Sequence, residues 1–249
     1  MILLIVGIPT LARGQAQPPL QPPAAPPPAP TGPPPRREGS AEFAFVGTSG
    51  NSSTTTLGIG GEYIFRPELW ETRFKVTYVR NEADDELKAE SFLMSLRAQR
   101  FLRPRLSAYG RYGYQRDRFA GIENRNVIEG GISYTVVDQV PHKLIVDAGL
   151  GYANEDRVLG DNISTATFNT GGLYTVRISE TSTFSEEGRF EFSLSDSSDW
   201  RFLNAIALTA KITTVFSLKL SNGIRYVNLP ALGFKDTDTV TAIALVAKF

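Results

Sequence analysis

The last ten residues of the chain, 240–249, alternate between two sets of side chains and end on an aromatic residue. The two sets are Thr241, Ile243, Leu245, Ala247 and Phe249, and Val240, Ala242, Ala244, Val246 and Lys248. Because successive side chains of a β-strand point to opposite faces of its sheet, this segment is expected to be a strand. A ten-residue alternation that closes on a terminal phenylalanine is typical of a membrane-spanning strand in an outer-membrane barrel.

Prolines divide the chain beyond residue 40 at regular intervals. Only four occur there, and Pro67, Pro104 and Pro141 are 37 residues apart. Proline cannot donate to the hydrogen-bond ladder of a central strand, so these residues should mark connections. The spacing fits two spans of about ten residues with one short and one longer loop. Extending it predicts further turns near Ile178 and Val215, hence six hairpins and about 12 strands.

The expected strands are roughly 41–48, 55–66, 70–81, 89–101, 105–117, 126–138, 142–154, 164–178, 182–195, 200–212, 215–227 and 239–249. Connections near residues 84, 121, 158, 197 and 233 should be longer than those near 67, 104, 140, 180 and 214, which places both termini in the periplasm. No long stretch repeats with a helical period between caps, so almost no helix is expected.

Energetic arguments decide which face of each strand meets lipid. In the expected strand 70–81, Trp70, Phe74 and Val76 share one face, whereas Arg73 and Lys75 lie on the other. Exposing Arg or Lys at mid-membrane costs roughly 2–4 kcal/mol each, so the charged face must point inward. An open sheet would leave unpaired edge amides in hydrocarbon, so the strands must close. The predicted fold is therefore all-β: a closed antiparallel up-and-down transmembrane β-barrel of about 12 strands.

The same choice of faces on the other strands predicts a set of charged residues that line the lumen. They are Glu62, Glu71, Arg73, Lys75, Arg97, Arg111, Glu129, Asp147, Glu187, Arg189, Glu191, Lys219 and Arg225. Ion channels select a sign of charge with rings of like charge, whereas here the two signs are interleaved. We therefore expect ion-paired filling, with Glu62 and Arg73 pairing across one hairpin, and a weakly selective pore as the alternative.

Two asparagines interrupt the expected apolar outer face. Asn204 and Asn222 would face lipid on neighbouring strands, and a turn centred near residue 213 would set them opposite each other. We hypothesise that their side chains hydrogen-bond across the strand pair and so lower the cost of exposure. The alternative is a different register between the two strands.

Composition excludes several classes of function. The chain has 26 basic and 26 acidic residues and no cysteine, so neither a nucleic-acid groove nor a thiolate metal site is expected. The single histidine, His142, lies in an expected turn without a partner that would make it a catalytic base. We predict no enzyme activity and no catalytic, cofactor-binding or metal-binding residue. Loop carboxylates in 82–86 and 236–238 leave divalent-cation binding as an alternative, although their spacing is not that of a calcium loop.

The first 40 residues are expected to lie outside the barrel, which should occupy 41–249. Residues 1–16 are predicted to be a signal peptide, since their apolar run stops at Pro9, well short of the ~20 residues of a membrane helix. No Lys or Arg precedes this run, so a start upstream is an alternative. Residues 17–40 are proline-rich and should form an extended periplasmic linker, with a docking ligand as the alternative.

Several short motifs carry a resemblance to a known family. They are Thr48-Ser49-Gly50-Asn51-Ser52, Asp117-Arg118-Phe119-Ala120-Gly121, Ala148-Gly149-Leu150-Gly151-Tyr152 and the terminal Phe249. With them, residues 41–249 resemble the salt-induced outer-membrane proteins of the domain-of-unknown-function-481 type. The resemblance implies a barrel in the bacterial outer membrane and leaves its activity open.

Two functions therefore fit the sequence: a structural, stress-related barrel of the envelope, or a narrow, weakly selective passive pore for small solutes or ions. A soluble ligand-binding barrel fits less well. The expected partners are outer-membrane lipid and lipopolysaccharide around the barrel, and the barrel-assembly machinery at the C-terminal strand that ends at Phe249.

Overall fold

A computed structural model describes residues 35–48, 54–83 and 86–249 of the chain. The expected signal peptide, most of the expected linker, residues 49–52 of the first family motif and the loop acids Asp84 and Asp85 lie outside these ranges.

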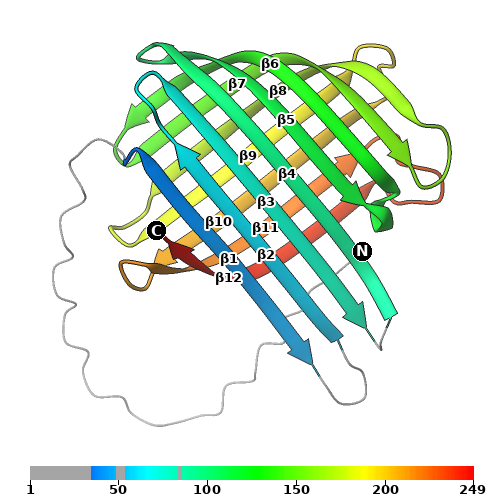
Figure 1. Cartoon of the computed structure of the whole chain (residues 1–249), viewed down its shortest axis with the longest axis horizontal. Helices are drawn as coiled ribbons and strands as arrows, with labels where there is room; N and C mark the ends of the chain where they lie inside the picture. Colours follow the sequence, from blue (N-terminus) through cyan, green and yellow to red (C-terminus); the bar gives the residue numbers. More distant parts are fainter. Residues whose placement is uncertain (1–34, 49–53, 84–85) are drawn as a thin grey trace.

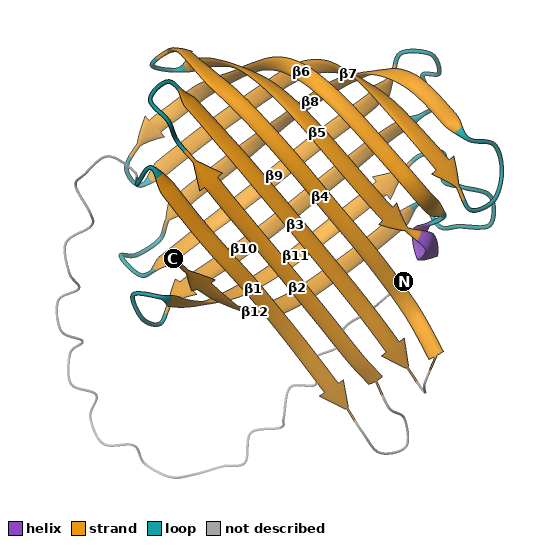
Figure 2. Ribbon diagram, viewed as in Figure 1, coloured by secondary structure: helices purple, strands orange, loops and turns teal. Residues whose placement is uncertain are grey.

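Twelve antiparallel strands form one closed sheet, in which each strand pairs with its neighbours in sequence and β1 pairs with β12 (Figure 1). The strands are β1 (Arg37–Thr48), β2 (Thr54–Phe65), β3 (Trp70–Ala83), β4 (Glu86–Arg103), β5 (Leu106–Asp117), β6 (Ile122–Gln139), β7 (His142–Arg157), β8 (Ile163–Arg177), β9 (Ser182–Ser193), β10 (Trp200–Lys211), β11 (Phe216–Val227) and β12 (Thr237–Lys248). One helical turn, η1 (Arg118–Ala120), follows β5 (Figure 2). The predicted all-β, closed, up-and-down antiparallel barrel is confirmed. Across the described ranges, no helix is long and apolar enough to cross a membrane.

The connections gather at two ends of the barrel, which we call the turn end and the loop end. At the turn end, Pro67, Pro104 and Pro141 separate consecutive strands, as their spacing predicted. The turns predicted near residues 178 and 215 lie there too, between β8 and β9 and between β10 and β11. The loop end carries the longer segments 118–121, 158–162, 194–199 and 228–236.

Several strands continue further toward the loop end than predicted. β3 and β4 leave only residues 84 and 85 between them, so the expectation of a longer connection near residue 84 is wrong. β6 begins at Ile122 instead of 126, and β7 ends at Arg157 instead of 154. The polar residues in these extensions have the composition of loops, yet they alternate and find partners across the barrel. Strand ends predicted from polarity alone therefore make these strands too short.

The two faces of the sheet have opposite chemistry. Large apolar side chains are exposed on one face, for example Phe43, which is 52% exposed, and Leu150, which is 62% exposed. In contrast, the largest fully buried side chains are the polar Asn169 and Thr167. This arrangement inverts that of a water-soluble protein, where apolar groups fill the interior. It suits a barrel with an apolar surround and a polar interior.

The predicted hydrogen bond between Asn204 and Asn222 is wrong. The register of β10 and β11 pairs Asn204 with Ile224 and Asn222 with Ile206, so the hairpin is centred on residue 214 rather than 213. The Asn204 side chain instead donates to Glu186 Oε1 on β9 at 3.0 Å. A shift of one residue in the centre of a turn moves every pair by two positions, which separates the two asparagines while keeping both on the outer face.

The barrel closes between β1 and β12 over a short length. Their register runs only from Ser40–Lys248 to Phe43–Leu245, whereas β1 pairs with β2 along all twelve of its residues. The terminal Phe249 extends the seam, because its backbone exchanges hydrogen bonds of 2.8 and 3.0 Å with Gly39. Figure 1 shows the two strands meeting near the C-terminus and diverging away from it.

Candidate functional site

Ion pairs across the enclosed space define the candidate site. Arg97 on β4 contacts Asp147 on β7 at 2.7 Å, and Arg225 on β11 contacts Asp117 on β5 at 3.0 Å. Side chains this many strands apart in a closed barrel can meet only through its interior. Lys219 on β11 contacts Glu42 on β1 at 2.8 Å along the inner wall, over the single strand β12 that lies between them. The interior is therefore crossed by charge pairs at more than one level.

A compact cluster occupies the middle of the barrel. The Arg97 guanidinium binds both carboxylate oxygens of Asp147, at 2.7 and 3.2 Å, and lies 4.0 Å above the centre of the Tyr109 ring. The Tyr109 hydroxyl donates to Glu129, which also accepts a hydrogen bond from Arg189 on β9. A guanidinium over an aromatic ring gains a cation–π contact in addition to its ion pair. The cluster thus ties together five strands, β4 to β7 and β9.

Glycine makes room for this cluster on the wall of β7. A Cβ atom on Gly149 would lie 2.7 Å from the Tyr109 hydroxyl oxygen. Any larger residue would push the tyrosine away from its position beside Glu129. This explains one glycine of the Ala148–Tyr152 motif as a packing requirement of the interior.

A second cluster lies toward the loop end. Glu155 accepts contacts from three guanidinium groups: Arg201 at 2.6 Å, Arg157 at 2.9 Å and Arg125 at 3.1 Å. Arg125 also pairs with Glu191 on β9. Glu155 is only 3% exposed, so its charge depends on these partners rather than on water.

Asp199, which directly precedes β10, lies at the edge of this second cluster. Its carboxylate is 4.0 Å from Arg201 Nε. Burial raises the pKa of the Asp199 carboxyl above its ordinary value, although the nearby arginine opposes the rise. Asp199 is thus held less firmly in its ionised form than a surface aspartate.

The mouth of the barrel at the loop end is bridged by Arg225. Its guanidinium contacts Asp117 on β5 at 3.0 Å and Asp238 on β12 at 2.7 Å. β5 and β11 are six positions apart in the ring of strands, so they lie on opposite sides of the barrel. The pair of Arg225 and Asp117 therefore spans the mouth.

The segment 228–236 folds over the same mouth. Its Ala231 is only 5% exposed, and the Leu229 carbonyl accepts a hydrogen bond from Arg157 at 2.8 Å. Gly121, at φ 79°, packs directly beneath, since a Cβ there would lie 2.6 Å from the Ala231 Cβ atom. This position combines left-handed backbone with close packing, both of which favour glycine.

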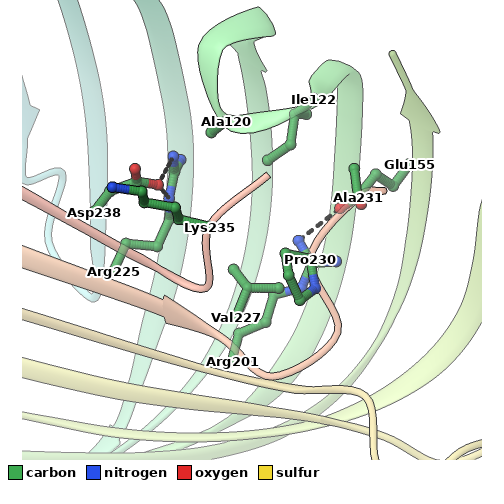
Figure 3. A pocket seen from close by; sticks show the side chains of 10 residues that line it. All are labelled: Ala120, Ile122, Glu155, Arg201, Arg225, Val227, Pro230, Ala231, Lys235 and Asp238. Atoms are coloured by element: carbon green, nitrogen blue, oxygen red, sulfur yellow. Dashed lines mark hydrogen bonds and ion pairs between the residues drawn. The ribbon is translucent and has the colours of Figure 1, made fainter. Parts of the chain in front are cut away.

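A small cavity remains between the segment 228–236 and the wall (Figure 3). It offers about 10 Å³ to the centre of a water molecule, room for roughly one water. Its lining includes Glu155, Arg201, Arg225, Pro230, Lys235 and Asp238. Figure 3 shows the pair of Arg225 and Asp238 on one side and that of Arg201 and Glu155 on the other. The cavity is too small for an organic substrate.

Most of the charged residues predicted to line the lumen contact a partner of opposite charge. Glu62 and Arg73 lie 3.6 Å apart, as expected, and Glu71 pairs with both Arg66 and Arg73. Arg97, Glu129, Asp147, Arg189, Glu191, Lys219 and Arg225 belong to the pairs given above. Lys75, Arg111 and Glu187 form no ion pair within 4.0 Å with any residue of the described ranges.

Sequence reasoning missed the second cluster. Arg125 and Glu155 each lie one residue beyond an expected strand end, where the sequence predicts loops. The alternation itself could have found them, because Arg125 shares the parity of Glu129 and Glu155 that of Asp147. Tyr109 was also missed, since an aromatic residue on the polar face gives no signal of its own.

Other residues singled out in the sequence have ordinary surroundings. His142 lies at the turn end, with its Nδ1 2.7 Å from the Tyr174 hydroxyl. Glu82 pairs with Arg80, and Asp238 with Arg225. In the second family motif, the Asp117 side chain accepts a hydrogen bond from the Ala120 amide at 3.1 Å and caps η1.

A closed barrel with an apolar outer face and an ion-paired interior has the fold of outer-membrane β-barrel proteins. The chain belongs to the family described as protein of unknown function DUF481, whose model matches residues 41–249. The predicted family is thereby confirmed, while its salt-induced label stays a prediction. No curated protein matches the chain.

Solved structures of outer-membrane proteins are similar to the chain at low sequence identity. An outer-membrane channel from Pseudomonas putida F1 has a TM-score of 0.53 and 8% identity, over 86% of this chain and 95% of that chain. The translocator domain of the autotransporter NalP from Neisseria meningitidis has a TM-score of 0.47 and 11% identity, over 86% and 87% of the two chains. At such identities the likeness is one of fold.

Proposed function

We propose that the protein is an integral barrel of the bacterial outer membrane whose lumen is held shut by ion pairs, and that it serves the envelope as a structural, stress-related component. The observation that carries this proposal is the pair of Arg225 and Asp117, which joins opposite walls of the mouth at 3.0 Å. The middle cluster around Arg97 and Asp147 adds a second barrier on the same path.

The energetics of buried charge support a closed state. Separating a buried ion pair leaves two uncompensated charges, and removing one partner of such a pair typically costs about 3–5 kcal/mol. A solute on its way through this interior would have to part pairs at both levels. Spontaneous opening should therefore be rare. We also expect no enzymatic reaction, because the single histidine of the sequence, His142, lies at the turn end and outside the two interior clusters.

The outer face supports the proposed location and partners. Apolar side chains such as Phe43, Leu150 and Leu218 would contact outer-membrane lipid, and the charged loop end would contact lipopolysaccharide. Strand β12, with its terminal Phe249, would be the element that the barrel-assembly machinery recognises. The stress-related role rests on the family resemblance, and measuring the protein level after a rise in external salt tests it.

A narrow, weakly selective pore is the second candidate. Lys75, Arg111 and Glu187 favour it, because none of them forms an ion pair with a residue of the described ranges, and Lys75 and Glu187 are exposed. Two cations and one anion would give only weak selection between ions.

Conductance of the purified, refolded full chain in planar bilayers separates the two candidates. We expect no steady conductance steps from the natural chain. Steps should appear in the variant Arg97→Ser/Asp147→Ser/Asp117→Ser/Arg225→Ser, which removes a complete pair at each level. The matched control Arg118→Ser/Glu123→Ser removes a pair of 2.7 Å on the exposed rim and should stay silent. Steady steps from the natural chain would overturn the closed barrel in favour of the pore.

A further inference from the structure

Three arginines lie side by side at one level of the inner wall. The register pairs Arg73 on β3 with Arg97 on β4, and Arg97 with Arg111 on β5. Residues directly opposite each other on neighbouring strands have Cβ atoms about 4.5–5.5 Å apart, and like charges so placed repel. Such a row needs compensating negative charge.

Only two of the three arginines have it. Arg73 contacts Glu62 at 3.6 Å and Glu71 at 3.3 Å, and Arg97 contacts Asp147 at 2.7 Å. Arg111 has neither an ion pair nor a hydrogen bond to any residue that the structure describes. Its register partner on β6, Glu129, is already engaged by Tyr109 and Arg189.

The adjoining level of the inner wall, toward the loop end, carries further hydrogen-bond donors. On the same three strands the register places Lys75, Ser95 and Gly113 in a row. Arg111 Nη2 lies 3.8 Å from the point where a Cβ of Gly113 would be, so the guanidinium reaches over the glycine. Lys75 is exposed and likewise has no ion pair within the described ranges.

We propose that Lys75, Ser95 and Arg111, on the inner wall around Gly113, form a binding site for a small oxyanion of the carboxylate or phosphate type. Arginine offers two parallel N–H donors that match such an anion, and lysine adds a point charge. The site has hydrogen-bond donors from three strands, and no carboxylate of the described residues lies within ion-pair distance of Arg111. The carboxylate opposite Lys75 in the register, Glu62, contacts Arg73 at 3.6 Å. These features select an anion over a cation. The inference does not depend on whether the lumen conducts.

The competing explanation is an internal counter-ion. The carboxylates whose fields act on Arg111 are those of Glu129, Glu187 and Glu191, while the charge of Arg189 opposes them. Of the three, only Glu187 on β9 has no ion pair of its own among the described residues. If Glu187 swung toward Arg111 it would exclude the anion, so the variant Glu187→Gln should bind the anion at least as tightly as the natural chain.

Inorganic phosphate is the probe, titrated into the refolded full chain in detergent at constant ionic strength and followed by 31P line broadening. We expect saturable binding that weakens roughly ten- to a hundredfold in Arg111→Gln, because charge-assisted hydrogen bonds are lost. Lys75→Gln should weaken binding less, and Arg111→Lys should fall between the natural chain and Arg111→Gln. The control Arg105→Gln removes an exposed turn arginine and should leave binding unchanged. A parallel titration with acetate shows whether the site binds a carboxylate or a phosphate more tightly.

Heat-modifiable migration in cold gels verifies that each variant is folded. If Arg111→Gln does not fold, Lys75→Gln and Ser95→Ala still test the site, since neither side chain has a hydrogen-bond or ion-pair partner among the described residues. Unchanged phosphate affinity in the folded variants of the site would overturn the proposal. So would an equal loss in Arg105→Gln, which would reveal surface attraction only. The conductance measurement in bilayers tests whether the lumen is closed. Its result does not affect the test of the anion site, which depends on phosphate affinity alone.

Discussion

At the scale of single residues, the interior depends on a few carboxylates with several partners each. Glu155 is the clearest case, because three arginines contact it and it is only 3% exposed. Replacing it with glutamine would leave three guanidinium groups close together without their shared counter-charge. Because these groups are buried, little water is available to solvate their charges.

We therefore predict that Glu155→Gln destabilises the barrel by about 3–5 kcal/mol. The measurement is the free energy of unfolding from urea titrations of the protein refolded in detergent. Glu123→Gln is the matched control, because Glu123 pairs with Arg118 on the exposed rim and its loss should change nothing measurable. Equal effects of the two substitutions would mean that the buried cluster is solvated.

The contact of Asn204 and Glu186 on the outer face is a polar pair whose energetic contribution can be measured. Asn204 donates to Glu186 at 3.0 Å on a face that is mostly apolar, where a second polar pair joins Asn222 to Thr241 at 2.8 Å. Asn204→Leu should destabilise the barrel, since it leaves the carboxylate without its donor, whereas Asn204→Leu/Glu186→Leu should recover the loss. A coupling free energy of about 1 kcal/mol or more is expected from a double-mutant cycle. If the effects of the two substitutions simply add, the side chains of Asn204 and Glu186 are not energetically coupled.

Residue faces could be predicted from the sequence, and so could the contact of Glu62 and Arg73 across one hairpin, but contacts across the barrel could not. Alternation placed Arg97 and Asp147 on the inner wall, because side-chain parity is a local property of a strand. Which of them touch depends on how far neighbouring strands are shifted and on the width of the closed barrel. The failure at Asn204 and Asn222 has the same origin, since a hairpin centred one residue later separates them.

At the scale of strands, the proline spacing and the alternation predicted all twelve elements. Errors lay at the strand ends: β1 begins at Arg37 instead of 41, and the extensions at the loop end place Arg125 and Glu155 in strands although their surroundings have the composition of loops. The short seam between β1 and β12 could not be predicted either. Pairing between the first and last strands is fixed by closure of the whole sheet, which no local pattern records.

The terminal Phe249 contributes to the pairing that closes the barrel at this seam. Phe249 exchanges two backbone hydrogen bonds with Gly39, beside only four register pairs. Deleting Phe249 should therefore lower the fraction of chains that close into a heat-modifiable barrel, measured by migration in cold gels. Phe249→Tyr keeps the backbone bonds and the aromatic ring, and should fold normally. An unimpaired deletion variant would show that the four register pairs suffice.

For the whole molecule, closure of the lumen at two levels leads to a prediction about how variants combine. The pair of Arg225 and Asp117 spans the mouth, and the pair of Arg97 and Asp147 lies in the middle. Barriers in series must all be removed before ions pass. Removing either complete pair alone, as serine variants, should therefore leave bilayer conductance near that of the natural chain.

The combined variant should conduct at least roughly tenfold more than either single-level variant, a non-additive effect expected of sites that act together. Removing both partners of each pair matters, because a single substitution would leave a buried unpaired charge and confuse opening with unfolding. If the mouth variant alone conducts as well as the combined one, the middle cluster is not a barrier. The interior would then be a water-filled passage closed only at the loop end, and Arg225 would be its gate.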